Sequence, residues 1–338
     1  MKSLLAALLA VASLALSVET GLFAQCSADA FVKPPFLKCG DTVAVVASSY
    51  QPTDSSVARS CRVLKSWGFV PVVAKNITDN PLPRKKDTVR YYSGDAAQRA
   101  ESLVAAYEDE SVKAIICARG GYGAIHLLDL IPQETYRKHP KWLVGYSDVT
   151  TLHCASFKAG VMSIHGEMCN SFGGLKAPDE GALKLRDLLK GDIPVYEISP
   201  TEYNSNGLAH GVLIGGNMIT MAALAGTGYD PSTSDGIILF FEEVEESMHA
   251  IDRLFNMLVL QGHLSNVRGI IFGDFEDCDR DLPYESVEEM LSVYTKKLGI
   301  PVCFGFPAGH GKVNMPLVEG AMTVMDVSDG RVGISFLL

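Results

Sequence analysis

The sequence predicts an α/β protein: an N-terminal doubly wound parallel sheet followed by a second, mixed α/β, β-rich domain. Up to about residue 150, short apolar runs alternate with helical stretches, which is typical of parallel strands covered by helices on both faces. Charged and turn-forming residues then fill 175–207 and indicate a junction between domains. We therefore expect an N-terminal domain over 31–185, a linker over 186–207 and a C-terminal domain over 208–338.

The individual elements follow from the length and spacing of the apolar runs. Near-continuous apolar runs such as TVAVVAS predict buried strands, and amphipathic runs predict helices. In the first domain we expect strands at 42–48, 70–74, 113–117 and 142–144, and helices at 56–67, 95–107 and 150–157. In the second domain we expect strands at 212–214, 237–241, 269–272 and 321–327.

The composition is that of a globular enzyme and excludes one class of partner. The chain has 338 residues, of which 47% are hydrophobic and 20% are charged, enough to bury the cores of two modest domains. Its formal net charge is −10. A general nucleic-acid binder needs clustered Lys and Arg to neutralise phosphates, so we expect no nucleic-acid partner.

The first 25 residues have the order of a secretory signal peptide. Met1-Lys2-Ser3 precede an apolar run over 4–18, and small residues follow near Ala24. The run is shorter than the roughly 20 residues that span a bilayer, so we expect cleavage after Ala24 or Ala30 and no stable membrane insertion afterwards. The expected location is the periplasm or cell envelope. A retained anchor and a lipid-modified Cys26 are the alternatives.

Ser147 is the first candidate for chemistry. It follows the expected strand at 142–144 and precedes the expected helix at 150–157. A turn of this kind exposes a serine hydroxyl above the sheet edge and aims backbone N–H groups toward it. The alternative is that Ser147 only caps the helix, and its surroundings depart from the G-x-S-x-G pattern.

A glycine-rich segment follows the neighbouring strand. Arg119-Gly120-Gly121-Tyr122-Gly123 comes after the run that ends at Cys117. Closely spaced glycines let backbone N–H groups approach an anion, either a phosphate or a developing oxyanion. The segment lacks both the G-x-G-x-x-G spacing and a Walker lysine, and a simple tight turn is the other interpretation.

An acid and a base are expected in the C-terminal half. Glu242 stands at the end of the apolar run that begins at Ile237, where a carboxylate can orient a histidine, whereas the acidic residues after it fit a solvated end. His310 lies in a glycine-flanked loop, which gives a general base its reach. His165 is the competing candidate. Zinc-binding spacing is not found, so we expect neither a metal nor another cofactor.

Several separate stretches resemble the LD-carboxypeptidase family of serine peptidases, the muramoyl-tetrapeptide carboxypeptidases. The similarity extends from about Lys38 to the C-terminus, and the motifs occur in the family's order. The stretches are GDTVAVVASS (40–49), ARGGYGAIHLL (118–128), LVGYSDVT (143–150), HGEM (165–168), GVLIGGNM (211–218), LFFEEV (239–244), IDRLFNML (251–258) and FGFPAGH (304–310).

The resemblance implies a catalytic triad and a fold. Ser147 would be the nucleophile, with Glu242 and His310 completing the triad, and the backbone N–H groups of Gly121 and Asp148 would form the oxyanion hole. The N-terminal domain would be flavodoxin-like, and the protein would be a homodimer. Glu167, Glu243 and Met248-His249 differ from the residues usual in the family, which leaves substrate detail open.

The implied activity is removal of the terminal D-alanine from a murein tetrapeptide through an acyl-enzyme. Arg119 is the candidate that would bind the terminal carboxylate, with Tyr122 as a second substrate-binding candidate. Two alternatives remain at this point. One is an amidase of a peptide-nucleotide antibiotic, and the other is an exported module that binds murein peptides without cleaving them.

Overall fold

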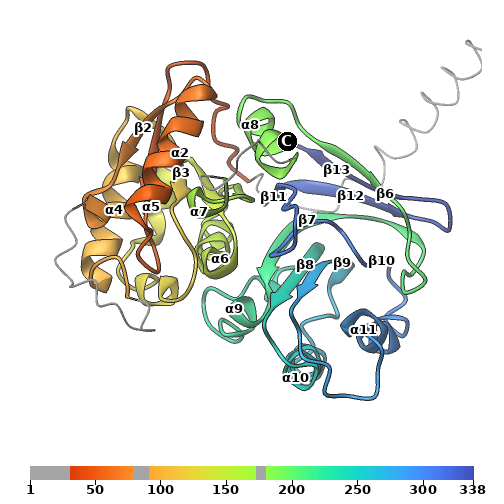
Figure 1. The fold of residues 1–338 in the computed structure, drawn as a ribbon. Coiled ribbons are helices and arrows are strands. Elements are labelled where there is room, and N and C mark those ends of the chain that lie inside the picture. Colours follow the sequence, from red (N-terminus) through yellow and green to blue (C-terminus); the bar gives the residue numbers. More distant parts are fainter. Residues whose placement is uncertain (1–30, 79–90, 173–179) are drawn as a thin grey trace, which may run out of the picture. The chain divides into compact units, whose positions relative to one another are not determined.

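The computed structural model describes residues 31–78, 91–172 and 180–338, whose strands form two sheets (Figure 1). The expected signal peptide and Cys26 lie outside these residues. From Phe31 to Leu338 the chain forms one compact unit. No helix in the described ranges is long and apolar enough to cross a membrane.

The first sheet has the strand order β11-β5-β4-β3-β1-β2. Its strands are β1 (Thr42–Val46), β2 (Val70–Val73), β3 (Val112–Cys117), β4 (Trp142–Gly145), β5 (Ser163–His165) and β11 (Leu317–Glu319). Strands β1 to β5 are parallel to one another, and β11 is antiparallel to β5. The expected doubly wound parallel sheet is thus confirmed.

Helices cover this sheet on both faces because its strands are apolar on both faces. Successive residues of β1 belong to different clusters, with Val43 and Val45 in one and Ala44 and Val46 in the other. One face is covered by α4 (Ala96–Glu108), α5 (Gln133–Lys138) and α6 (Thr150–Lys158), and the other by α2 (Asp54–Ser66), α7 (Cys169–Phe172) and α8 (Glu180–Leu189). Shorter helical segments are α3 (Lys75–Thr78), η2 (Ala124–Leu127) and η3 (Ser147–Val149).

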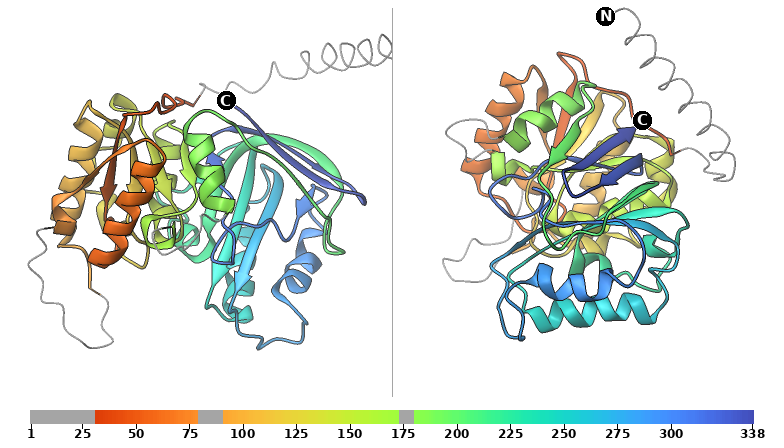
Figure 2. Two further views of the ribbon diagram at one scale, coloured as in Figure 1. Left: turned by 45° about the horizontal axis from the view of Figure 1, so that its top comes forward. Right: turned by 90° about the vertical axis from the view of Figure 1, so that its right-hand side faces the viewer.

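The second sheet has the strand order β10-β9-β8-β7-β12-β13-β6. Its strands are β6 (Val195–Ile198), β7 (Gly207–Asn217), β8 (Ile237–Val244), β9 (Val267–Glu276), β10 (Val302–Cys303), β12 (Met322–Val327) and β13 (Val332–Leu337). Strands β7 to β10 are parallel, and the remaining strands are antiparallel. The helical segments are α9 (Met218–Ala222), η4 (Pro231–Thr233), α10 (Met248–Leu260) and α11 (Val287–Thr295). Figure 2 shows α10 and α11 together on one side of this sheet.

The observed boundary between the two halves of the chain differs from the expected linker at 186–207, because a strand from the C-terminal half joins the first sheet. That segment contains the end of α8 and all of β6, which pairs with β13 as an edge strand of the second sheet. In the other direction, β11 comes from the C-terminal part of the chain and pairs with β5 of the first sheet. Each of the two hydrophobic clusters includes residues of both sheets.

Candidate active site

Ser147 occupies a strained turn directly after β4. Its φ angle is +62°, a left-handed conformation that L-residues other than glycine seldom adopt. The glycines nearby are needed for packing, because a Cβ atom at Gly145 would lie 2.8 Å from Val149 and one at Gly120 would lie 3.0 Å from the Cβ of Ser147. The N-cap of α6 is Val149, without a side-chain cap hydrogen bond. Helix capping by Ser147 is therefore not the observed arrangement.

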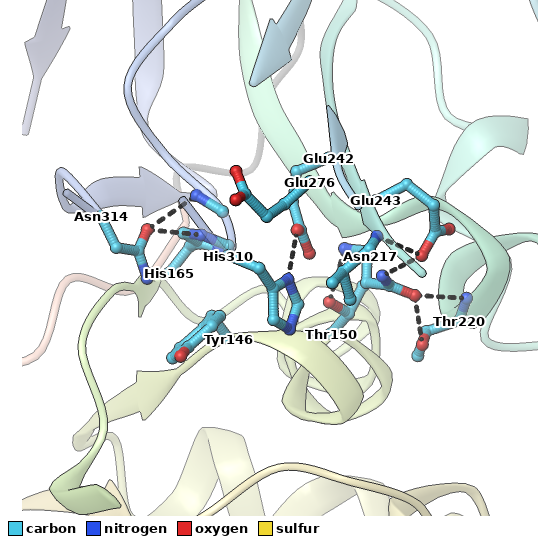
Figure 3. Close-up of polar contacts among 12 residues, drawn as sticks. Tyr146, Thr150, His165, Asn217, Thr220, Glu242, Glu243, Glu276, His310 and Asn314 are labelled. Carbon is cyan, nitrogen blue, oxygen red and sulfur yellow. Dashed lines mark hydrogen bonds and ion pairs between the residues drawn. The ribbon is translucent and has the colours of Figure 1, made fainter. Parts of the chain in front are cut away.

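His310 and Glu242 form a hydrogen-bonded pair at 2.6 Å between Nδ1 and Oε2 (Figure 3). Glu242 is on β8 and fully buried, and His310 lies in the loop between β10 and β11. Burial of the imidazole lowers its pKa, but the hydrogen bond and the negative charge of Glu242 outweigh this effect, so the pKa of His310 is raised. The carboxylate fixes the proton on Nδ1 and leaves Nε2 to accept a proton.

Glu242 and Glu243 have different partners because neighbouring residues of a strand point to opposite faces. Glu243 accepts hydrogen bonds from Asn217 Nδ2 at 2.6 Å and from the Ile219 N–H at 2.9 Å. Its burial raises its pKa to about 7. Figure 3 shows Glu243 beside Asn217 and Glu242 above His310.

His165, the competing histidine, is a buried structural group. Desolvation lowers its pKa to about 3, so its imidazole is neutral. Its Nε2 lies 3.1 Å from Oδ1 of Asn314, and the same oxygen accepts the N–H of Gly309 at 3.1 Å. Asn314 thus connects β5 to the residue that precedes His310. Nothing in the sequence pattern distinguished Asn314 from an ordinary loop residue.

Ser147 and His310 line one cavity of about 320 Å³. The other residues that line it are Arg119, Gly120, Gly121, Tyr146, Met168, Ser171, Val244 and Glu245. The Tyr146 ring packs against the His310 ring with centroids 5.0 Å apart. The structure therefore brings the expected nucleophile and base from the two halves of the chain to one site.

The expected oxyanion-hole residues lie on two neighbouring loops. Gly121 has a φ angle of +111° and lines the cavity, and a Cβ atom there would lie 2.0 Å from the Tyr50 ring. The buried Asp148 carboxylate accepts the Ser49 hydroxyl at 2.5 Å and the Ala124 N–H at 2.8 Å. This side chain, whose role was not foreseen, joins the loops that follow β1, β3 and β4.

The two expected substrate-binding side chains are placed differently. Arg119 lines the cavity, donates a hydrogen bond to the Gln51 carbonyl at 3.2 Å and lies over the Tyr50 ring. Tyr122 is half-exposed, packs against Tyr92 and does not line the cavity. Within the described residues, no group of three or more His, Cys, Asp or Glu side chains could hold a metal ion.

Comparison with known families matches both halves of the chain. Residues 43–166 match the LD-carboxypeptidase N-terminal domain, and residues 210–325 match the LD-carboxypeptidase C-terminal domain. A probable murein peptide carboxypeptidase of Bacillus subtilis is 31% identical, with 88% of this chain and 92% of the relative covered. A murein tetrapeptide carboxypeptidase of Pseudomonas aeruginosa is 29% identical, with 70% of this chain and 80% of the relative covered.

Solved structures show the same fold. The muramoyltetrapeptide carboxypeptidase of Oxalobacter formigenes superposes with a TM-score of 0.77 at 26% identity, covering 87% of this chain and 98% of that one. The microcin C7 self-immunity protein of Escherichia coli is a further relative, 26% identical, with 88% of this chain and 94% of the relative covered.

Proposed function

The chain belongs to the LD-carboxypeptidase family of serine peptidases, and from that premise we propose that it removes the terminal D-alanine from a murein tetrapeptide through an acyl-enzyme. One observation carries the proposal. His310, hydrogen-bonded to the buried carboxylate of Glu242, shares a cavity with Ser147 on its strained turn. A nucleophile, a base and a group that orients the base are the parts that covalent acyl transfer requires.

In the proposed reaction, Nε2 of His310 takes the proton from the Ser147 hydroxyl. The Ser147 oxygen attacks the carbonyl at the L-centre of the diamino acid in the third position. Backbone N–H groups of Gly121 and Asp148 stabilise the oxyanion. His310 then protonates the departing amine of D-alanine, and Glu242 offsets the imidazolium charge. Water activated by His310 hydrolyses the ester, which releases the tripeptide and restores Ser147.

Removal of a terminal residue requires a group that binds its carboxylate. Arg119 is suited to this task because it lines the cavity and a guanidinium can bind a carboxylate through two parallel hydrogen bonds. Stacking on Tyr50 and the bond to the Gln51 carbonyl restrict its position. Tyr122 lies outside the cavity lining, so the same argument does not extend to it.

A further part of the proposal is that the protein acts on murein peptides in the periplasm or cell envelope, which the order of residues 1–25 supports. We also propose that it is a homodimer, on the resemblance to its family alone. The supporting feature is a charged start, a short apolar run and small residues. Cell fractionation with an antibody, and sedimentation of the mature protein, test location and assembly separately.

The relative from Escherichia coli supports a second candidate function, hydrolysis of an amide in a peptide-nucleotide antibiotic. We expect an aromatic side chain beside the site in such an enzyme, to stack on the nucleobase. The aromatic residue among the described cavity-lining residues is Tyr146, whose ring already packs against His310. Trp67 and Trp142 are both buried, and neither lines the cavity. Murein peptide therefore remains the favoured substrate.

The decisive experiment is mass spectrometry of murein tetrapeptide after incubation with the mature protein, with the Ser147→Ala variant and with chelator in parallel. We expect the wild type alone to release one alanine, with no effect of chelator. Intact tetrapeptide together with cleavage of a peptidyl-nucleotide amide would favour the second function.

A further inference from the structure

Two residues that line the cavity have an unusual backbone conformation. Among the described residues, three other than glycine have a positive φ angle: Ser147 at 62°, Glu245 at 58° and Asp277 at 51°. Ser147 and Glu245 both line the cavity, whereas Asp277 does not. Such conformations cost energy and persist only where the surroundings enforce them, and they are enriched at functional sites. The positive φ of Glu245 in the cavity lining therefore indicates a functional role for this residue as well as for Ser147.

The local structure holds Glu245 at the rim of the cavity. It follows β8, which ends at Val244, and its N–H donates to the carbonyl of Glu276 at 3.0 Å. Val244 and Glu245 are consecutive lining residues, and the side chain of Glu245 is exposed. The turn thus places Glu245, an exposed acidic residue, in the lining of the site. In the described part of the chain, none of the assigned hydrogen bonds or ion pairs engages this carboxylate.

The described residues that line the cavity include one with a cationic and one with an anionic side chain, besides His310. They are the Arg119 guanidinium and the Glu245 carboxylate. The proposed substrate carries the matching charges, because its last residue ends in a carboxylate and the diamino acid before it has a side-chain ammonium. The bond to be cleaved joins these two residues. A site that attacks this bond must therefore accommodate both charges at short range.

We infer that Glu245 binds the free ammonium group on the side chain of the third residue of the murein peptide and so selects substrates with a diamino acid at that position. This inference rests on the proposed function and adds a specificity residue to it. An exposed carboxylate is suited to this role, because it attracts a cation without the cost of desolvating a buried charge.

Glu245 has a second way to influence turnover. Burial lowers the pKa of His310, while the carboxylates of Glu242, Glu243 and Glu245 raise it. Loss of the Glu245 charge through this route would change turnover of every substrate by the same factor. Recognition of an ammonium group would change turnover only of substrates that carry one. The ratio between two substrates therefore separates these roles.

The test compares two N-acetylmuramoyl tetrapeptides, one with a free side-chain amine on the third residue and one with that amine acetylated. The muramoyl group blocks the N-terminus, so the two peptides differ at a single amine. Release of D-alanine gives kcat/KM for each peptide with the wild type, Glu245→Gln and Asp277→Asn. The last variant is the matched control, since it removes one exposed carboxylate at positive φ outside the cavity.

We expect the wild type to prefer the free amine by about fivefold, the size of a solvent-exposed ion pair. Glu245→Gln should bring the ratio near one, mainly through KM for the amine peptide, while Asp277→Asn keeps the wild-type ratio. An unchanged ratio in Glu245→Gln, or an equal loss for both peptides, overturns the inference and leaves the peptidase function standing. If the wild type releases no alanine from either peptide, the proposed function itself fails and the inference with it.

Discussion

Replacement of Glu242 by Gln tests how the buried carboxylate supports His310. In the native pair, Oε2 of Glu242 accepts the Nδ1–H of His310 at 2.6 Å, and Oε1 is buried with no hydrogen-bond partner in the described residues. Gln has two ways to occupy this space. Its amide nitrogen can face Nδ1, which forces the imidazole proton onto Nε2, or its oxygen can face Nδ1, which leaves the NH₂ group buried without an acceptor.

Both arrangements remove catalytic power. The first leaves Nε2 unable to accept the Ser147 proton, and the second loses the negative charge that stabilises the imidazolium. We expect kcat to fall by about 10³- to 10⁴-fold, equivalent to about 4 to 5.5 kcal/mol of transition-state stabilisation. Because Glu242 raises the pKa of His310 against the effect of burial, the variant should also have a lower His310 pKa.

The assay is D-alanine release from tetrapeptide between about pH 5 and pH 9, with nitrogen NMR of the imidazole to identify its tautomer. The wild type should lose activity as pH falls through the raised pKa of His310, because the base must be neutral. Glu243→Gln is the matched control for kcat, since above about pH 7 it removes the neighbouring buried negative charge while the His310–Glu242 hydrogen bond stays in place. A folded Glu242→Gln variant with activity within about tenfold of wild type would refute the assigned role.

Two stability predictions follow from other buried or strained groups. Ser147→Gly should be more stable than Ser147→Ala by about 0.5 to 1 kcal/mol, because the strain that glycine relieves at this positive φ exceeds the extra backbone entropy that glycine loses on folding. Urea unfolding measures the difference, and a glycine variant less stable than the alanine variant would contradict a strained turn. Burial raises the pKa of Glu319 to about 8, and Oε2 accepts the Gly215 N–H at 2.9 Å. Since this pKa is higher in the folded state, its contribution to stability is full below the unfolded pKa of about 4.5 and is lost as pH rises toward 8. Glu319→Gln should therefore lose less stability than the wild type between about pH 5 and pH 8 in urea unfolding, and parallel losses would count against a raised pKa.

The sequence was informative where a feature is local. The apolar runs of β1, β3 and β4 were long enough to identify buried strands, and the fold class followed from their alternation with helices. The turn at Ser147 was recognisable because a strand, a serine and a helix follow one another directly. The distinction between Glu242 and Glu243 was harder, since it depends on which face of β8 meets His310.

Features that depend on distant contacts were not predicted. Strand β11 has only three residues and no periodic signal, and its partner β5 lies far away in the sequence. Strand β6 was absorbed into the expected linker, because one buried Tyr among exposed neighbours resembles loop sequence. Asn314 and the Asp148 carboxylate were also missed, since a polar residue acquires a structural role only through the partners that the fold brings to it.

The missed contacts explain how a site divided between two sheets keeps its geometry. The chain leaves the second sheet after β10, presents His310, and enters the first sheet seven residues later as β11. Between these points Asn314 binds both the Gly309 N–H and His165 of β5, so the segment carrying the base is attached to the sheet that carries the nucleophile. Catalytic rates fall steeply when reacting groups are displaced by about 1 Å. Because Asn314 attaches the segment that follows His310 to β5, the distance between His310 and Ser147 depends mainly on that segment. Small shifts of the second sheet should therefore change this distance only in part.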